Sequence, residues 1–409
     1  MLLREMIEKE QGWDTPIVQA LEDTDFYFAT MCNVYDSKLP DMTMEKKFHC
    51  RTEGVDLAKY APALERELDH LCSLQFREKT LARLGETRFL KPGYIDFLRL
   101  LKLNRDHIKV TPLSGGVIDV RSKGPARLTT WFETHTVEIL EELYFRDKFA
   151  DLELTVGDDR LTAKLIKYEN LSKNHKFSLS EFGTRRRAFF AWQKYVLKRL
   201  IDFFGTNSSH FVGTSNMYLA TELGLRFTGS QAHEILQTGQ GLDHVRLSQS
   251  QSYMLGLWQE VYRGDLGIAL SDVVGFDAFL RDFDLFLAKL FDGMRHDSGD
   301  PFKWADKAVD HYTKLRINPL TKTLLFSDGL NVDLVERLLR YLCDRALLAF
   351  GVGTDFTNDL GPKALQLVMK AVKVNGYPVA KISDSSGKGM CEDPAHEADV
   401  RRVFRIGEA

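Results

Sequence analysis

The sequence predicts an α/β fold, in which an irregular β/α barrel is joined to an N-terminal α/β domain. From about residue 160 onward, short apolar or β-branched runs end in polar clusters, and a helical pattern follows each cluster. Such repeats indicate parallel strands with right-handed crossovers. About seven are present, which favours a barrel whose loops meet at one mouth. A doubly wound open sheet is the alternative, but the early G-x-G-x-x-G turn that it would need is absent.

The N-terminal part is predicted to contain a strand, a group of helices and a hairpin. Residues 46–51 alternate between two faces as a strand does, and residues 57–103 carry amphipathic helical spacing. Two β-like runs within 107–121 flank residues 113–116, which is typical of a hairpin. The pair at 124–125, Gly-Pro, then predicts a turn, and we place the first domain boundary there.

Three segments follow from this boundary. Residues 1–125 are assigned to the N-terminal α/β domain and residues 126–374 to the barrel domain, while residues 375–409 are expected to complete the N-terminal domain. A chain of 409 residues is too long for one small core, so two domains are expected.

The barrel strands are predicted to end at seven polar loops, which span residues 181–187, 213–216, 229–234, 271–272, 295–300, 327–331 and 351–354. The helix after Asn331 shows the expected apolar face, formed by Val332, Val335, Leu338, Leu339 and Leu342. Each unit is therefore a strand, a polar loop and a helix.

Composition and charge exclude several classes of protein. A net charge of −3 argues against a general nucleic-acid binder. The five cysteines are widely spaced without a C-x-x-C pair, which indicates reduced thiols, no zinc site and a cytoplasmic location. The N-terminus is too charged for a signal peptide, and no apolar run could span a bilayer. We expect a small-molecule partner.

The stretch 227–241 carries the strongest candidate for chemistry. A Gly-Ser break precedes His233 and Glu234, which are predicted to enter the first turn of a helix with Ser230 as its N-cap. A helix N-terminus suits an anion, and a neutral histidine beside it can act as nucleophile or base. The alternative is a capping or buried, hydrogen-bonded histidine.

Several other loops favour anions. Residues 185–187 are three arginines, for which a solvated basic helix face is the alternative. Residues 213–216 and 351–354 can present backbone N–H groups to phosphate oxygens, although each is also a common turn. Residues 295–301 combine an arginine with carboxylates that could contact a ribose or a metal-bound pyrophosphate. Residues 327–329 offer a similar polar loop, for which a structural Asp-Gly turn is the alternative. Together these loops predict a substrate with several phosphates and a sugar.

The set of motifs resembles the bacterial form of the nicotinate phosphoribosyltransferase family over nearly the whole chain. The motifs lie at residues 23–27, 181–187, 211–216, 231–234, 295–301, 350–354 and 381–388. The resemblance implies a type II phosphoribosyltransferase fold and a homodimer. It also implies that nicotinate is joined to phosphoribosyl pyrophosphate in NAD salvage, with ATP hydrolysis coupled through a phosphorylated histidine, which by motif position is His233.

The resemblance also assigns roles to single residues. The pyridine ring is expected to stack between Phe182 and a Tyr27 that comes from the partner subunit. Arg295 would pair with the substrate carboxylate and Asp297 with the ribose hydroxyls, while Glu234 and Asp297 join His233 as catalytic residues. The 5′-phosphate would lie on Gly329, Gly351 and Gly353, and the phosphate or pyrophosphate oxygens near Arg51 and Arg185. Further substrate-binding positions are Ser215, Asp328, Thr354 and Lys381.

Mg²⁺ is expected with the pyrophosphate, and no protein metal site is assigned. The sequence departs from the family pattern at two positions. The family often carries a lysine after the motif tyrosine and an arginine after the second glycine loop, where this chain has Phe28 and Asp355. Phosphate contacts from these two positions are therefore not expected.

Other functions remain open at this stage. The chain could use another pyridine, nicotinamide or quinolinate, or it could be a non-catalytic relative. Nicotinamide-using relatives carry an aspartate at the position of Ser215, where a carboxylate can accept the amide N–H. A neutral serine opposite Arg295 suits the carboxylate of nicotinate, and a cap on the following helix is the alternative role of Ser215.

Overall fold

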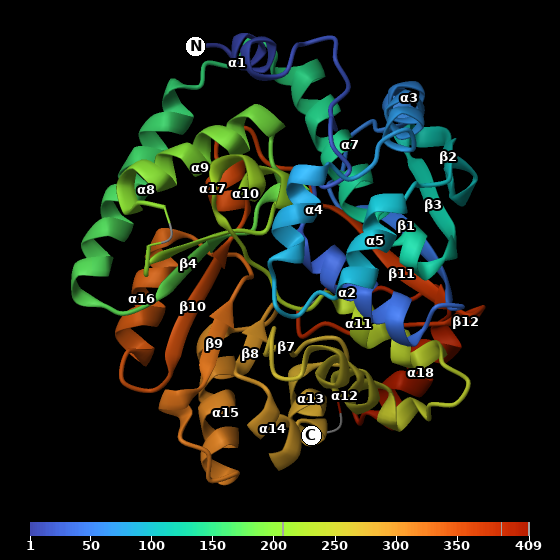
Figure 1. Cartoon of the computed structure of the whole chain (residues 1–409), viewed down its shortest axis with the longest axis vertical. Coiled ribbons are helices and arrows are strands. Elements are labelled where there is room, and N and C mark those ends of the chain that lie inside the picture. Colours follow the sequence, from blue (N-terminus) through green and yellow to red (C-terminus); the bar gives the residue numbers. More distant parts are fainter. Residues whose placement is uncertain (207, 386, 408–409) are drawn as a thin grey trace.

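We describe the computed structural model of the chain for residues 1–206, 208–385 and 387–407 (Figure 1). Ser386, part of the last motif named above, lies outside the described residues. Two sheets organise the fold: a curled parallel sheet and a smaller antiparallel sheet beside it.

The parallel sheet confirms the predicted barrel units. Its seven strands follow the order β6-β5-β4-β10-β9-β8-β7, and every neighbouring pair is parallel. Each of the seven predicted loops begins within two residues of the end of one of these strands, which are β4 (Ser178–Glu181), β5 (Phe211–Thr214), β6 (Arg226–Phe227), β7 (Ile268–Leu270), β8 (Gly293–His296), β9 (Thr323–Phe326) and β10 (Leu347–Val352).

The barrel is irregular because the sheet does not close between its edge strands β6 and β7 within the described residues. The side chain of Gln231 partly replaces the missing neighbour, since its Oε1 accepts a hydrogen bond of 3.1 Å from the backbone N–H of Leu270 on β7. The polar loop after β6 is thereby held at the mouth of the sheet.

The N-terminal domain contains the antiparallel sheet, with strand order β12-β11-β1-β3-β2. The predicted strand and hairpin are confirmed as β1 (Thr43–Cys50), β2 (Ile108–Pro112) and β3 (Ile118–Pro125). The turn predicted at 124–125 is wrong, because Gly124 pairs with Met44 and extends β3 to its end.

A second correction concerns the segment that completes this sheet. Strand β11 (Leu367–Val374) lies in the range first assigned to the barrel, but it pairs antiparallel with β1, and β12 (Tyr377–Pro378) follows it. Residues of β11 are buried on both faces of the strand, so its sequence shows no clear alternation of apolar and polar residues. Such a pattern fits a strand of either sheet, and the sequence alone does not assign β11 to one of them.

Helices cover the parallel sheet and one side of the N-terminal sheet (Figure 1). The N-terminal helices are α1 (Leu3–Glu10), α2 (Phe26–Lys38), α3 (Ala61–Leu71), α4 (Glu78–Gly85), α5 (Pro92–Leu100), α6 (Ala126–Thr129) and α7 (Phe132–Phe149). The others are α8 (Thr155–Asn174), α9 (Phe190–Phe204), α10 (Met217–Leu223), α11 (His233–Thr238), α12 (Ser250–Tyr262), α13 (Phe276–Asp282), α14 (Leu285–Leu290), α15 (Pro301–Lys314), α16 (Val332–Leu342), α17 (Thr354–Thr357) and α18 (Pro394–Val403).

Helix α16 shows why the pattern could be read from the sequence. The side chain of Asn331 caps it by accepting the N–H of Leu334 at 2.9 Å, and the five predicted apolar residues are all buried. Among the described residues, no helix has the length and apolar character needed to cross a bilayer. All five cysteines are free thiols.

Candidate active site

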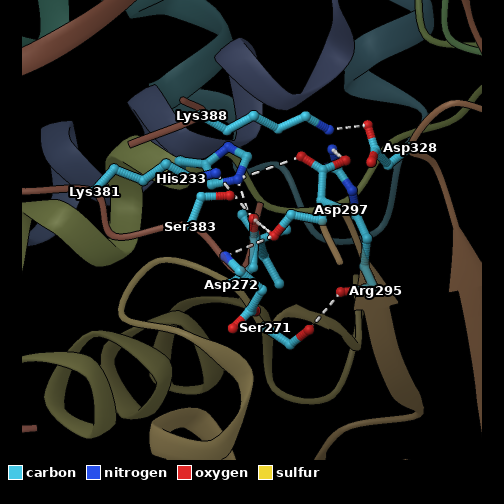
Figure 2. A network of polar contacts seen from close by, with 12 residues as sticks. His233, Ser271, Asp272, Arg295, Asp297, Asp328, Lys381, Ser383 and Lys388 are labelled. Carbon is cyan, nitrogen blue, oxygen red and sulfur yellow. Dashed lines mark hydrogen bonds and ion pairs between the residues drawn. The ribbon is translucent and has the colours of Figure 1, made fainter. Parts of the chain in front are cut away.

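A cavity of about 350 Å³ lies where the carboxyl ends of the parallel strands meet the N-terminal sheet. This volume is suited to a small-molecule ligand. All the predicted site residues line it except Gly351. The polar side chains at its centre come from four barrel loops and from the segment after β12 (Figure 2).

Gly351 has a packing role in place of the predicted phosphate contact. A Cβ atom at this position would lie 2.2 Å from the ring of Phe182. Only glycine therefore lets β10 pass behind this ring. Gly329 does line the cavity, and its φ of +58° explains why the Asp-Gly turn needs glycine.

His233 is the first residue of α11, but the predicted cap is wrong. The N-cap position is Ala232, which offers no side-chain hydrogen bond. The hydroxyl of Ser230 instead accepts a hydrogen bond of 2.9 Å from Arg295 Nη1. Ser230 thus fixes an arginine of the opposite loop.

Two carboxylates hold the imidazole of His233. Its Nε2 lies 2.9 Å from Asp272 Oδ1 and 3.3 Å from Asp297 Oδ2. Burial, together with the nearby ammonium of Lys381, lowers the pKa of His233 to about 4. The ring is therefore neutral near pH 7. Because a carboxylate can only accept, Nε2 carries the proton and Nδ1 keeps the free lone pair.

Asp272 is the main functional residue that sequence reasoning missed. Besides His233, it receives hydrogen bonds from Ser298 Oγ at 2.7 Å and Lys381 Nζ at 2.9 Å (Figure 2). The ammonium of Lys381 and the hydrogen bond from His233 hold the pKa of Asp272 well below its usual range. Its place directly after β7, in a predicted loop, was the signal that could have identified it.

Glu234 does not pair with His233. Its carboxylate turns toward the N-terminal domain, where it accepts hydrogen bonds from Thr130 Oγ1 at 2.9 Å and Tyr35 OH at 3.1 Å and forms a buried ion pair with Lys46. Through these contacts Glu234 ties the start of α11 to strand β1, while it also lines the cavity.

Arg295 is almost fully engaged by the protein. Its guanidinium donates to Ser327 Oγ, Ser230 Oγ, the carbonyl of Gln231 and Asp297 Oδ1, at 2.7 to 3.1 Å. A bidentate pair with a substrate carboxylate would have to displace some of these bonds. In this state Arg295 orients Asp297, whose pKa it holds far below the usual range.

Both aromatic rings predicted for the pyridine site lie in the same cavity of one chain, since Tyr27 and Phe182 both line it. The reason is a backbone tie between α2 and the loop after β5. Phe26 N donates to Ser215 O at 2.7 Å, and Asp25 forms an isolated β-bridge with Asn216.

Ser215 lies beside an acid. Its hydroxyl donates to Asp25 Oδ1 at 2.6 Å, and burial raises the pKa of Asp25. The alternative capping role is wrong, because Asn216 is the N-cap of α10 and accepts the N–H of Leu219. Arg295 and Ser215 share the cavity without a direct hydrogen bond.

Cations surround the cavity. Arg51, Arg185, Lys370 and Lys388 line it with Lys381. Glu133 on α7 lies 3.4 Å from Lys370 and 3.6 Å from Arg185, and Lys388 pairs with Asp328 at 2.5 Å. Nothing local in the sequence distinguished Glu133 or Lys370, because each sits inside a regular element.

The cluster of His233, Asp272 and Asp297 is the group of possible metal ligands found among the described residues. It does not fit a resident Mg²⁺, which prefers oxygen ligands. Asp272 is already occupied by three donors, one of them the ammonium of Lys381.

The two departures from the family pattern do not line the cavity. Phe28 is fully buried in the core. The carboxylate of Asp355 pairs with Lys164 Nζ on α8 at 2.9 Å.

Comparisons with known proteins agree with the geometry. The nicotinate phosphoribosyltransferase (NAPRTase) N-terminal domain model matches residues 23–141, and the nicotinate phosphoribosyltransferase (NAPRTase) family model matches residues 177–408. A nicotinate phosphoribosyltransferase of Xylella fastidiosa is 47% identical over 392 residues, covering 95% of this chain and 98% of the relative. One of Acidovorax is 44% identical, with coverage of 95% and 99%.

Solved structures show the same fold. A nicotinate phosphoribosyltransferase of Vibrio cholerae superposes with a TM-score of 0.90 at 33% identity, covering 96% of this chain and 95% of that chain. One of Porphyromonas gingivalis gives a TM-score of 0.88 at 29% identity, covering 95% and 100%. The similarity therefore extends over both domains.

Proposed function

The chain belongs to the nicotinate phosphoribosyltransferase family, and we propose that it joins nicotinate to phosphoribosyl pyrophosphate, with ATP hydrolysis coupled through His233. The products are nicotinate mononucleotide, pyrophosphate, ADP and phosphate, in a step of NAD salvage. The observation that carries the coupling is the neutral, carboxylate-held imidazole of His233 in a cavity lined by cations.

The transfer of phosphate from ATP to His233 depends on the tautomer of the ring, in which Nδ1 carries the free lone pair. Nδ1 of His233 attacks the terminal phosphorus of ATP, the bond to the bridging oxygen breaks, and ADP leaves. Asp272 holds Nε2–H and stabilises the positive charge that develops on the ring. Water later attacks the phosphorus and releases phosphate, which returns the free imidazole.

The transfer step needs orientation and charge stabilisation. The faces of Tyr27 and Phe182 would fix the pyridine ring so that its nitrogen meets the anomeric carbon. Asp297 would contact the ribose hydroxyls, while the cavity cations bind the leaving pyrophosphate as positive charge builds on the sugar. Mg²⁺ is proposed to enter with the polyphosphate groups of the substrates, because the protein cluster does not suit it.

An assay with three pyridines tests this function. Purified protein is incubated with phosphoribosyl pyrophosphate, Mg²⁺ and nicotinate, nicotinamide or quinolinate, with and without ATP. We expect nicotinate to be the preferred substrate and ATP to stimulate its use, with ADP formed alongside the nucleotide. A non-hydrolysable ATP analogue is the control and should not stimulate. A preference for nicotinamide or quinolinate, or product formation indifferent to ATP, would contradict the proposal.

We also propose a cytoplasmic homodimer. The family resemblance supports the dimer, and the five free thiols support a reducing compartment. Since Tyr27 and His233 line one cavity in one chain, each subunit should hold a complete site. A heterodimer of Tyr27→Ala and His233→Ala subunits should therefore show no recovered activity. Recovery in heterodimers verified by mass would show that Tyr27 acts across the interface.

A further inference from the structure

Arg186 is a cation in the cavity without a carboxylate partner. It belongs to a 3₁₀ turn, Thr184–Arg186, that follows β4. Its neighbours are paired: Arg187 forms a buried pair with Asp23 at 2.7 Å, and Arg185 lies 3.6 Å from Glu133. Among the described residues no carboxylate pairs with Arg186, and its buried Nε has no acceptor, although the residue lines the cavity.

The surroundings of Arg186 disfavour its charge. Burial, with the guanidinium of Arg185 and then that of Arg51 nearby, lowers the pKa of Arg186 to about 10. Two carboxyls offset this effect only in part: burial raises the pKa of Glu141 to about 8, so it is protonated at neutral pH, and Asp297 already pairs with Arg295. A bound anion would remove the imbalance, since guanidinium groups bind phosphate through two parallel hydrogen bonds.

Arg186 lies next to the glycine loop that precedes α17. Its carbonyl accepts a hydrogen bond of 2.8 Å from Asn358 Nδ2, which lies directly beyond α17. The loop before α17 contributes Gly353 and Thr354 to the same cavity. An unpaired guanidinium therefore lies beside the cavity-lining turn at residues 353–354.

We propose that Arg186 binds a phosphate group of the phosphoribosyl substrate. This inference rests on the proposed function, since it takes the phosphoribosyl substrate as the ligand. The phosphate could be the 5′-phosphate or the pyrophosphate, which share the same recognition chemistry. A nicotinate carboxylate on Arg186 is a different assignment, which the experiment separates.

Three variants test the proposal by calorimetric titration with pyrophosphate, ribose 5-phosphate and nicotinate, each with Mg²⁺. Arg186→Met keeps the aliphatic stem and removes the charge, and Arg186→Lys keeps the charge without the planar fork. Arg226→Met is the matched control, because Arg226 is exposed at β6 and lies outside the cavity. We expect Arg186→Met to weaken at least one phosphate ligand ~10- to 100-fold, with Arg186→Lys intermediate and nicotinate within about threefold.

The melting temperature of Arg186→Met, with and without pyrophosphate, distinguishes a ligand-binding role of Arg186 from a role in supporting the fold. Without ligand, Arg186→Met should melt higher than wild type, by on the order of 2 °C, because an unpaired cation next to two others is removed. Saturating pyrophosphate should then raise the Tm of the variant less than that of wild type. A lower Tm without ligand would show that Arg186 supports the fold.

The outcomes are distinct. Weaker binding of one phosphate ligand by Arg186→Met identifies the phosphate that Arg186 contacts. Unchanged binding of both phosphate ligands, or weakening confined to nicotinate, overturns the inference. If wild-type protein binds none of the three ligands, the proposed function fails, and the role of Arg186 as a phosphate contact fails with it.

Discussion

Replacing His233 by alanine is expected to abolish ATP hydrolysis and the acid-labile phosphorylation of the protein. The loss should be on the order of 10³-fold or more, because the nucleophile is removed and no other imidazole shares the carboxylate pair of Asp272 and Asp297 among the described residues. Weak synthesis of the nucleotide should remain, since the pyridine and phosphate contacts are intact, but ATP should no longer stimulate it. Radiolabelled phosphate transfer from ATP measures the first effect and nucleotide formation the second.

His244→Ala is the matched control for this variant. His244 is exposed and contacts Tyr253 outside the cavity, so its loss should leave phosphorylation unchanged. Circular dichroism should confirm that both variants are folded. Undiminished ATP stimulation in His233→Ala, or stable phosphate on another residue, would show that His233 is not the acceptor.

Replacing Ser215 by aspartate is expected to reduce the specificity constant for nicotinate by up to about a thousandfold. A carboxylate about 4 Å from that of nicotinate, at an effective dielectric of ~20, would repel it by roughly 4 kcal/mol. The new side chain would also lie beside Asp25, and two adjacent carboxyls share a proton, so this value is an upper bound. Nicotinamide is neutral and should be spared or improved.

Ser215→Ala separates charge from packing. It removes the hydrogen bond to Asp25 without adding a carboxylate, so it should affect both pyridines alike and only slightly. The measurement is the specificity constant for nicotinate and nicotinamide in both variants. Equal weakening of the two substrates by Ser215→Asp would contradict the electrostatic account of nicotinate selection.

The parallel sheet could be predicted because its signals are local. Strands such as β7, β9 and β10 are short, mostly apolar runs, and the loops after the strands carry polar residues that line one cavity, as at Asp297 and Asp328. Helix α16 combines an Asn cap with an unbroken apolar face. These features depend only on neighbouring residues, so the pattern was sufficient for the seven units.

Other features depend on partners distant in the sequence. The strand β11 is buried in either sheet that it might join, and only its pairing with β1 decides between them. Similarly, a serine three residues before the first residue of a helix suggests a cap, yet the hydroxyl of Ser230 accepts a hydrogen bond from Arg295, 65 residues away. The neighbouring residues in the sequence do not determine which of two possible hydrogen-bond partners a strand or a side chain takes.

The same limit applies to the acids around His233. Glu234 is adjacent in sequence, but helical geometry turns successive side chains to different sides, and Lys46 holds this one. Asp272, 39 residues away, holds the imidazole instead. The sequence thus predicted most of the residues that line the cavity, whereas their pairings required the structure.

The most direct measurement of the central claim is the rate at which ATP phosphorylates His233 as a function of pH, with the site located by mass spectrometry. Only the neutral ring can attack, and burial lowers its pKa to about 4. The rate should therefore stay level from pH 8 to about 5.5 and fall only as the pH approaches that value. Half of the rate lost near pH 6.5, or phosphate located elsewhere than on His233, would contradict the account of a buried, neutral nucleophile held by Asp272.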